Sequence, residues 1–116
     1  MKAEGLRELV TGSLEEIKAR DVTVLDVRGM TTITDFMVVC SGTSNRHVKS
    51  IADKLVEDAK AQGVRPAGVE GEDDGEWVLV DLGDLIVHIM LPKIRDFYNL
   101  ERLWDVARPK ADAASE

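Results

Sequence analysis

Apolar positions along the chain switch between two spacings, and the switches mark the expected elements. Residues 6–17 repeat apolar side chains at helical spacing, and residues 22–29 are rich in β-branched side chains and end at a glycine. This pattern predicts a helix followed by a strand. Residues 35–41 are a continuous apolar run, which is typical of a central strand covered on both faces. From Asn45 an amphipathic helix is expected to continue to Gly63, a glycine placed where helices commonly end.

Three strands are predicted in the second half of the chain. Residues 65–71 form a short, weak strand, whereas residues 76–82 and 85–91 form two strong ones that a tight Gly83-Asp84 turn separates. Short closing helices are expected after Pro92. This order of elements predicts an α/β (α+β) fold, a mixed sheet of about five strands with helices packed on it.

The size of the chain allows a single domain. With 116 residues, we expect one domain over residues 1–108 and a flexible tail over residues 109–116. No apolar run approaches the ~20 residues of a membrane span, and the lone Cys40 lies in an apolar strand, so a cytoplasmic protein with a buried cysteine is expected. The formal net charge of −7 disfavours direct nucleic-acid contact and favours basic partners.

The turn at residues 41–44, Ser-Gly-Thr-Ser, leads from a strand into a helix, as phosphate-binding loops do. It lacks both the lysine of a P-loop and the glycines of a dinucleotide-binding loop. Thr43 or Ser44 is therefore predicted to cap the helix, although anion capture at the helix start remains an alternative. Nucleotidyl transfer needs paired metal-binding acids soon after such a turn, and the sequence there is Asn-Arg-His-Val-Lys-Ser.

Few residues offer other chemistry. His47 is expected to be a solvated surface residue and His88 a hydrogen-bonded structural one, so no zinc site, catalytic residue or cofactor site is predicted. The acids of residues 70–76 lack the order of a calcium loop and are read as a solvated turn, with an acidic rim for a basic partner as the functional alternative. Strand alternation places Trp77 and Asp81 on one face, a composition more typical of an interface than of a deep core.

Four stretches together resemble the ribosomal silencing factor family, also called the Iojap-like family. They are TDFMVVCSGTSNRHVKSIADKL, then Glu70-Gly71, then GEWVLVDLGDLIVHIM and RDFYNLERLW, in that order between about Leu25 and Asp105. The segment before Asp35 departs from the family, which more often has an alanine-containing connector there.

The resemblance implies a translational repressor rather than an enzyme. Members are expected to bind the large ribosomal subunit through large-subunit protein fourteen, to block joining of the small subunit when nutrients are scarce, and to form homodimers when free. Their fold resembles that of nucleotidyltransferases without the catalytic acids.

Carried onto this sequence, the resemblance assigns the partner contact to the segment WVLVDLGD. Trp77 is the expected apolar anchor and Leu82 an exposed apolar contact at the hairpin turn, while Asp81 and Asp84 pair with basic side chains. Glu70 and Tyr98 are further expected contacts. Gly83 is expected to form the turn and not to contact the partner.

Two other functional classes stay open at this point. A divergent nucleotidyltransferase would require Asp26, Asp81 or Asp84 to converge on a metal. A plain cytoplasmic dimerisation module would self-associate without binding ribosomal subunits.

Overall fold

The computed structural model describes residues 2–98, and its elements follow the predicted order. The helices are α1 (Ala3–Glu16), α2 (Asn45–Ala61) and α3 (Pro92–Tyr98). The strands are β1 (Arg20–Asp26), β2 (Phe36–Ser41), β3 (Gly68–Glu70), β4 (Trp77–Asp81) and β5 (Leu85–Met90). The predicted tail over residues 109–116 lies outside the described residues.

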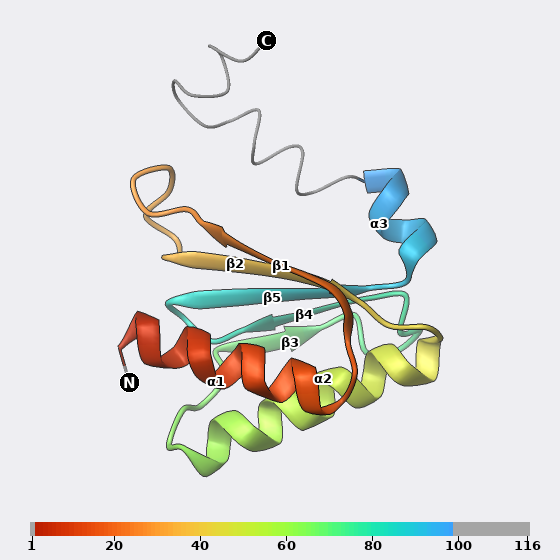
Figure 1. Ribbon diagram of the computed structural model, residues 1–116, viewed down its shortest axis with the longest axis horizontal. Coiled ribbons are helices and arrows are strands. Elements are labelled where there is room, and N and C mark those ends of the chain that lie inside the picture. Colours follow the sequence, from red (N-terminus) through yellow and green to blue (C-terminus); the bar gives the residue numbers. More distant parts are fainter. Residues whose placement is uncertain (1, 99–116) are drawn as a thin grey trace, which may run out of the picture.

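The strands form one sheet in the order β1-β2-β5-β4-β3. The central strands β2 and β5 run parallel, whereas the other neighbouring pairs are antiparallel. Parallel neighbours need a crossover connection, and α2 begins that crossover directly after β2. The predicted mixed sheet of five strands with packed helices is therefore confirmed (Figure 1).

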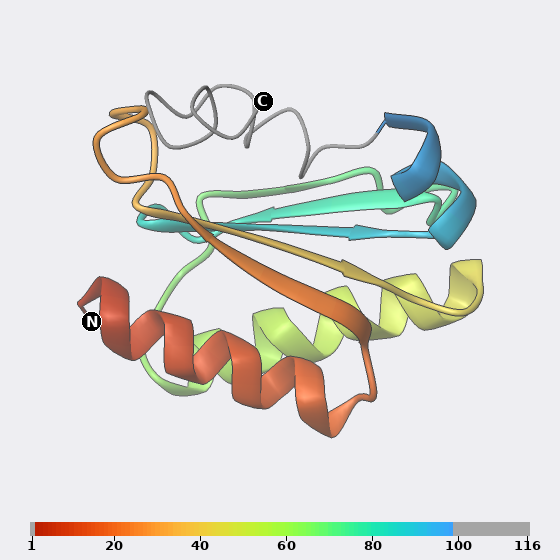
Figure 2. The same cartoon turned by 45° about the horizontal axis from the view of Figure 1, so that its top comes forward.

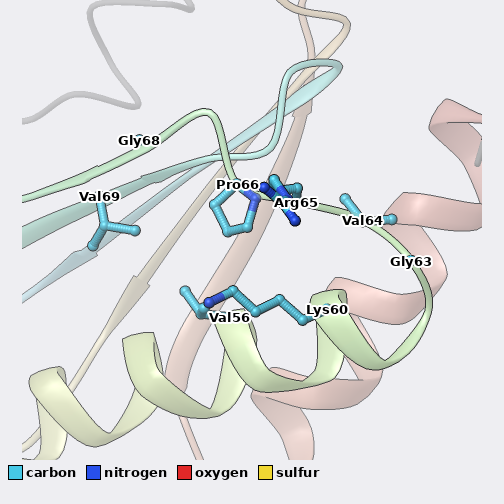
Figure 3. A pocket seen from close by; sticks show the side chains of 8 residues that line it. All are labelled: Val56, Lys60, Gly63, Val64, Arg65, Pro66, Gly68 and Val69. Carbon is cyan, nitrogen blue, oxygen red and sulfur yellow. The ribbon is translucent and has the colours of Figure 1, made fainter.

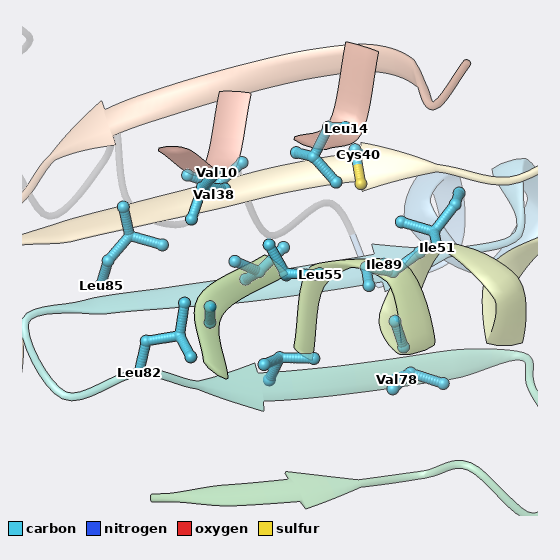
Figure 4. Close-up of a cluster of buried hydrophobic side chains, with 14 of the residues drawn as sticks. Val10, Leu14, Val38, Cys40, Ile51, Leu55, Val78, Leu82, Leu85 and Ile89 are labelled. Carbon is cyan, nitrogen blue, oxygen red and sulfur yellow. The ribbon is translucent and has the colours of Figure 1, made fainter. Parts of the chain in front are cut away.

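Two layers make up the molecule: the sheet, and the helices α1 and α2 side by side on one of its faces (Figures 1 and 2). We call this face the helix face and the opposite one the outer face. The main apolar core lies between the helices and the helix face, where Val10, Leu14, Ile51 and Leu55 meet strand residues such as Val38 (Figure 4). All five are fully buried. Burying a side chain of this kind stabilises a fold by roughly 1.5–3 kcal/mol.

A second, smaller apolar cluster covers part of the outer face. It is centred on β1, β2 and β5 and contains Leu25, Val27, Met37, Val39 and Met90. Every residue of β2 and of β5 is buried as a result. This explains why both strands appear as continuous apolar runs in the sequence instead of alternating. Cys40, on the helix face of β2, is buried as predicted, and burial raises the pKa of its thiol to about 12.

Both ends of α2 are fixed by local hydrogen bonds. Ser44 accepts a hydrogen bond from the backbone N–H of His47 (3.1 Å), which confirms the capping role of the Gly-Thr-Ser turn. At the other end Gly63 has a φ of +79°, and the N–H groups of Gly63 and Val64 donate to the carbonyls of Lys60 and Ala59. This is the Schellman motif, and it turns the chain back toward the sheet.

His47 is not the solvated residue that the sequence suggested. Its ring is half-buried, accepting a hydrogen bond at Nδ1 from the Thr43 N–H (2.9 Å) and donating from Nε2 to the Ile17 carbonyl (2.9 Å). Ile17 lies 30 positions earlier in the chain, so no local pattern indicates this contact. The residue ties the end of α1 to the start of α2.

The helix α3 is attached to the sheet through Ile94, which packs against both apolar clusters, and through hydrogen bonds of Arg95. The Arg95 guanidinium donates to the Asp21 carbonyl (2.6 Å), to Ser41 Oγ (3.2 Å) and to Thr23 Oγ1 (3.1 Å). Hydrogen bonds from a charged donor are among the stronger ones, so α3 is held at the end of β1 and β2. None of the helices within residues 2–98 is long and apolar enough to cross a membrane.

Candidate protein-binding surface

The strand β4 presents two different sets of side chains. Val78 and Val80 are fully buried in the core on the helix face, while Trp77, Leu79 and Asp81 are half-buried on the outer face. This is the alternation that the sequence predicted. Because one face of β4 lies in the core and the other is partly accessible, side chains on the accessible face can contact a partner or be substituted without disturbing the core.

The outer face brings residues from three strands together at this edge of the sheet. The register places Glu70 of β3 and His88 of β5 on either side of Leu79. Glu70, Gly71, Trp77 and Leu79 line a shallow hollow of about 290 Å³. We call Glu70, Trp77, Leu79 and Asp81 the β4 surface; it combines an indole and an aliphatic side chain with two carboxylates.

The orientation of Trp77 is set by a hydrogen bond to His88. The indole Nε1–H donates to His88 Nδ1 at 3.0 Å, and the two ring centroids are 5.8 Å apart. His88 sits diagonally across the β4–β5 ladder from Trp77, since its direct partner is Leu79. Diagonal neighbours lie within reach of long side chains. The expected structural role of His88 is confirmed.

The protonation state of His88 follows from its burial. The side chain is 7% exposed, and this desolvation lowers its pKa from 6.5 to about 4. The imidazole is therefore neutral near pH 7, with Nδ1 free to accept from Trp77 and the proton on Nε2. A neutral acceptor is what a tryptophan needs, because the indole N–H can only donate.

The turn before β4 is anchored to the start of α2. Asn45 Nδ2 donates to the Asp74 carbonyl (2.6 Å) and Lys49 Nζ to the Asp73 carbonyl (3.1 Å). Gly71 has a φ of +88°, and a Cβ at this position would collide with the Trp77 carbonyl oxygen. The turn therefore packs directly against Trp77, and Glu72, Asp73 and Asp74 are exposed beside it, which places the predicted acidic rim next to the β4 surface.

The hairpin end of the surface is a tight turn. Asp81 Oδ1 accepts a hydrogen bond from the Gly83 N–H (2.8 Å), and Gly83 has a φ of +89°, so the predicted turn role of Gly83 is confirmed. Asp84 is exposed, and its carbonyl accepts from the N–H groups of Asp35 and Phe36. Of the two aspartates predicted as contacts, Asp84 is thus the more accessible, while Asp81 also shapes the turn.

Leu82 and Tyr98 are two predicted contact residues that the structure does not place on the β4 surface. The expectation that Leu82 is exposed is wrong: it is 6% exposed and lies in the main core with Val78 and Val80 (Figure 4). The strand alternation carries one residue past the end of β4, so the side chain of Leu82 stays on the helix face despite its place at the turn. Tyr98 is the last residue of α3, and its side chain lies outside the described residues.

The geometry does not support a nucleotidyltransferase centre formed by Asp26, Asp81 and Asp84. Asp26 is on β1 and Asp81 on β4, with β2 and β5 between them, a separation of roughly 14 Å at the usual strand spacing. Asp26 is paired with Arg28 at 2.6 Å, and the hydrogen bond from that guanidinium lowers its pKa to about 2. Within residues 2–98, no group of three His, Cys, Asp or Glu side chains is arranged to hold a metal ion.

Sequence reasoning left two residues out of the predicted surface. Leu79 lies between Trp77 and Asp81 on the same face, so the alternation that singled out Trp77 already indicated it. Gly71 carries no such signal, because its contact with Trp77 depends on the path of the turn.

Comparison with known proteins gives a consistent picture. The family model described as ribosomal silencing factor during starvation matches residues 1–116. Relatives named ribosomal silencing factor RsfS include one from Chromobacterium violaceum, 42% identical over 94% of this chain and 89% of its own, and one from Haemophilus influenzae, 43% identical over 85% and 97%. A crystal structure of a Chromobacterium violaceum protein, 43% identical, superimposes with a TM-score of 0.88 over 90% of this chain and 87% of its own.

Proposed function

Because this chain belongs to the family of ribosomal silencing factors, we propose that it binds the large ribosomal subunit and keeps the small subunit from joining. The docking site is large-subunit protein fourteen, and the consequence is lower translation under nutrient limitation. The protein acts in the cytoplasm and is a homodimer when free.

The observation that carries this proposal is the composition of the β4 surface. Interface hot spots are enriched in tryptophan, and Trp77 is a half-buried, pre-oriented aromatic on a sheet face. Its hydrogen bond to His88 satisfies the indole donor, so docking does not have to supply a partner for it. A side chain fixed before binding loses less conformational freedom when the complex forms.

Charge supports a basic protein partner over ribosomal RNA. Glu70 is exposed beside Leu79 and Asp84 is exposed at the hairpin turn, and the chain as a whole has a formal charge of −7. Such a surface is repelled by phosphate and attracted to lysine and arginine side chains, which selects a protein patch among the surrounding RNA. Steric occlusion then suffices as the mechanism: a body on the joining surface competes with the small subunit, and no bond is made or broken.

The proposal is tested by co-sedimentation of the purified protein with isolated large subunits at physiological salt. We expect the protein in the subunit fraction at micromolar concentration, and an excess of it should lower the yield of joined ribosomes from purified subunits. Absence of the protein from the large-subunit fraction would contradict the proposal.

Trp77→Ala isolates the β4 surface in the same assay. Loss of a hot-spot tryptophan costs at least about 2 kcal/mol, so binding should weaken roughly thirtyfold or more. Val22→Ala is the matched control, because Val22 is an exposed apolar residue on β1 at the opposite edge of the sheet. Circular dichroism establishes that both variants fold. Equal binding by the two variants would refute the anchor role of Trp77.

A further inference from the structure

A second hollow lies away from the β4 surface, where the end of α2 meets β3. Its volume is about 680 Å³, within the range of small-molecule sites. Its walls come from the last turns of α2, the connector after that helix and the edge strand β3 (Figure 3). The side chains that line the hollow include Val56, Lys60, Val64, Arg65, Pro66 and Val69.

The walls of this hollow are fixed by the backbone. The Schellman motif at Gly63 directs the chain back over α2, and Pro66 restricts the connector before the chain enters β3. Val69 faces the same side of the sheet as Val80, and it packs against the core. The hollow is therefore a pre-formed feature of the fold, and a ligand would not have to order it.

Among the described lining residues of the hollow, the two polar side chains are both cations. Lys60 extends along α2 toward Val56, and Arg65 lies on the connector opposite that helix (Figure 3). Among the residues that the structure describes, no acidic one lines the hollow. Within residues 2–98 neither Lys60 nor Arg65 forms an ion pair, in contrast to Arg28 and Lys54, which pair with nearby carboxylates. The hollow therefore combines these two cations with an aliphatic floor on a chain whose net charge is −7.

These features select a class of ligand. Val56, Val64, Pro66 and Val69 form an aliphatic floor, and the described lining residues include no aromatic side chain on which a nucleobase could stack. The cations favour an anionic head group, and the floor favours a hydrocarbon body. We propose that this hollow is a binding site for a small aliphatic carboxylate, with its carboxylate at Lys60 and Arg65 and its chain on the valines. We call it the α2–β3 site.

The proposal predicts a dependence on chain length and on the sign of the charge. The probes are butyrate, hexanoate and hexylammonium, titrated into isotopically labelled full-length protein while methyl and amide NMR shifts are followed. Each buried methylene contributes about 0.8 kcal/mol, so hexanoate should bind about fifteenfold more tightly than butyrate. Hexylammonium should not bind at this hollow, and the shifts caused by hexanoate should centre on Val56, Val64 and Val69.

Charge reversal provides the second test. The double variant Lys60→Glu/Arg65→Glu should lose at least about tenfold in affinity for hexanoate and gain binding of hexylammonium. The double variant Arg46→Glu/Lys93→Glu is the matched control, since it changes the net charge equally at two exposed cations outside the hollow. It should bind hexanoate as the parent does.

Three results would overturn the proposal. The first is the absence of hexanoate-dependent shifts at Val56, Val64 and Val69 of the parent protein at tens of millimolar probe. The second is equal binding of hexanoate and hexylammonium, which would indicate a purely apolar surface. The third is an equal loss of affinity in both double variants, which would attribute the effect to net charge and not to the α2–β3 site. The shift mapping on the parent decides the matter even if a variant fails to fold.

Discussion

The buried imidazole of His88 makes the stability of this fold depend on pH in a window where most carboxylates are already ionised. Burial lowers the pKa of His88 from 6.5 to about 4. Below pH 6.5 the unfolded chain therefore takes up a proton at this residue that the folded chain does not. The contribution of the neutral, buried His88 to the free energy of unfolding is fully present above pH 6.5 and is lost as the pH falls toward 4.

The size of the effect follows from the pKa difference. A shift of about 2.5 pKa units corresponds to roughly 3.4 kcal/mol at 1.36 kcal/mol per unit, reached when the pH is below both values. At pH 5 the unfolded state is almost fully protonated and the folded state is not, so about 2 kcal/mol of the free energy of unfolding should be lost relative to pH 8. The ion pair of Asp26 does not contribute to this loss, because the pKa of Asp26 is lowered from 3.8 to about 2 and its stabilising effect is lost only at lower pH.

Urea denaturation followed by circular dichroism at pH 8, 6.5 and 5 measures this loss. His88→Asn is the comparison, because its amide oxygen can accept from the Trp77 indole but does not titrate. The variant should be less stable at pH 8 but should lose about 2 kcal/mol less than the parent between pH 8 and pH 5. If both proteins lose the same amount, His88 is not the group responsible, and the account of its burial is wrong.

Two further predictions concern the turn and the core beneath the β4 surface. Gly71→Ala should destabilise the fold by at least about 1 kcal/mol in urea denaturation and weaken binding to large subunits, because a Cβ at φ +88° collides with the Trp77 carbonyl oxygen. Gly68→Ala is the control, since a Cβ at Gly68 has open space, and equal effects of the two variants would contradict the steric argument. Leu82→Ala should cost about 2–5 kcal/mol of stability but leave large-subunit binding within twofold under folding conditions, whereas selective loss of binding would restore Leu82 as a contact.

Strand and helix identities were readable from the sequence because burial on one or both faces leaves a periodic trace. The alternation at residues 77–81 assigned the faces of β4 correctly, the continuous apolar run at residues 35–41 indicated a central strand, and residues 85–91 were correctly predicted as a strand. The glycines at 63 and 83 marked backbone positions with positive φ. Each of these signals is local, with a range of a few residues.

The contacts that orient the site were not readable, since they join segments that are distant in the sequence. The Trp77–His88 pair depends on the register of β4 against β5, and the Asn45 contact with Asp74 spans 29 residues. The error at Leu82 has a different origin. A position beside a turn suggests exposure, but the strand alternation continues through Leu82 and places it with Val78 and Val80.

The central parallel pair has a consequence for the synthesis of this protein. Phe36 pairs with Leu85, so the two parallel strands are separated by 49 positions (36 to 85), and β5 is the last strand to be made within residues 2–98. A nascent chain that has emerged only through β4 lacks the strand that joins its halves, β1 and β2 on one side and β3 and β4 on the other. Pairing between such distant segments also slows folding. The sheet can therefore be completed only after the residues of β5 have left the ribosome that makes the chain.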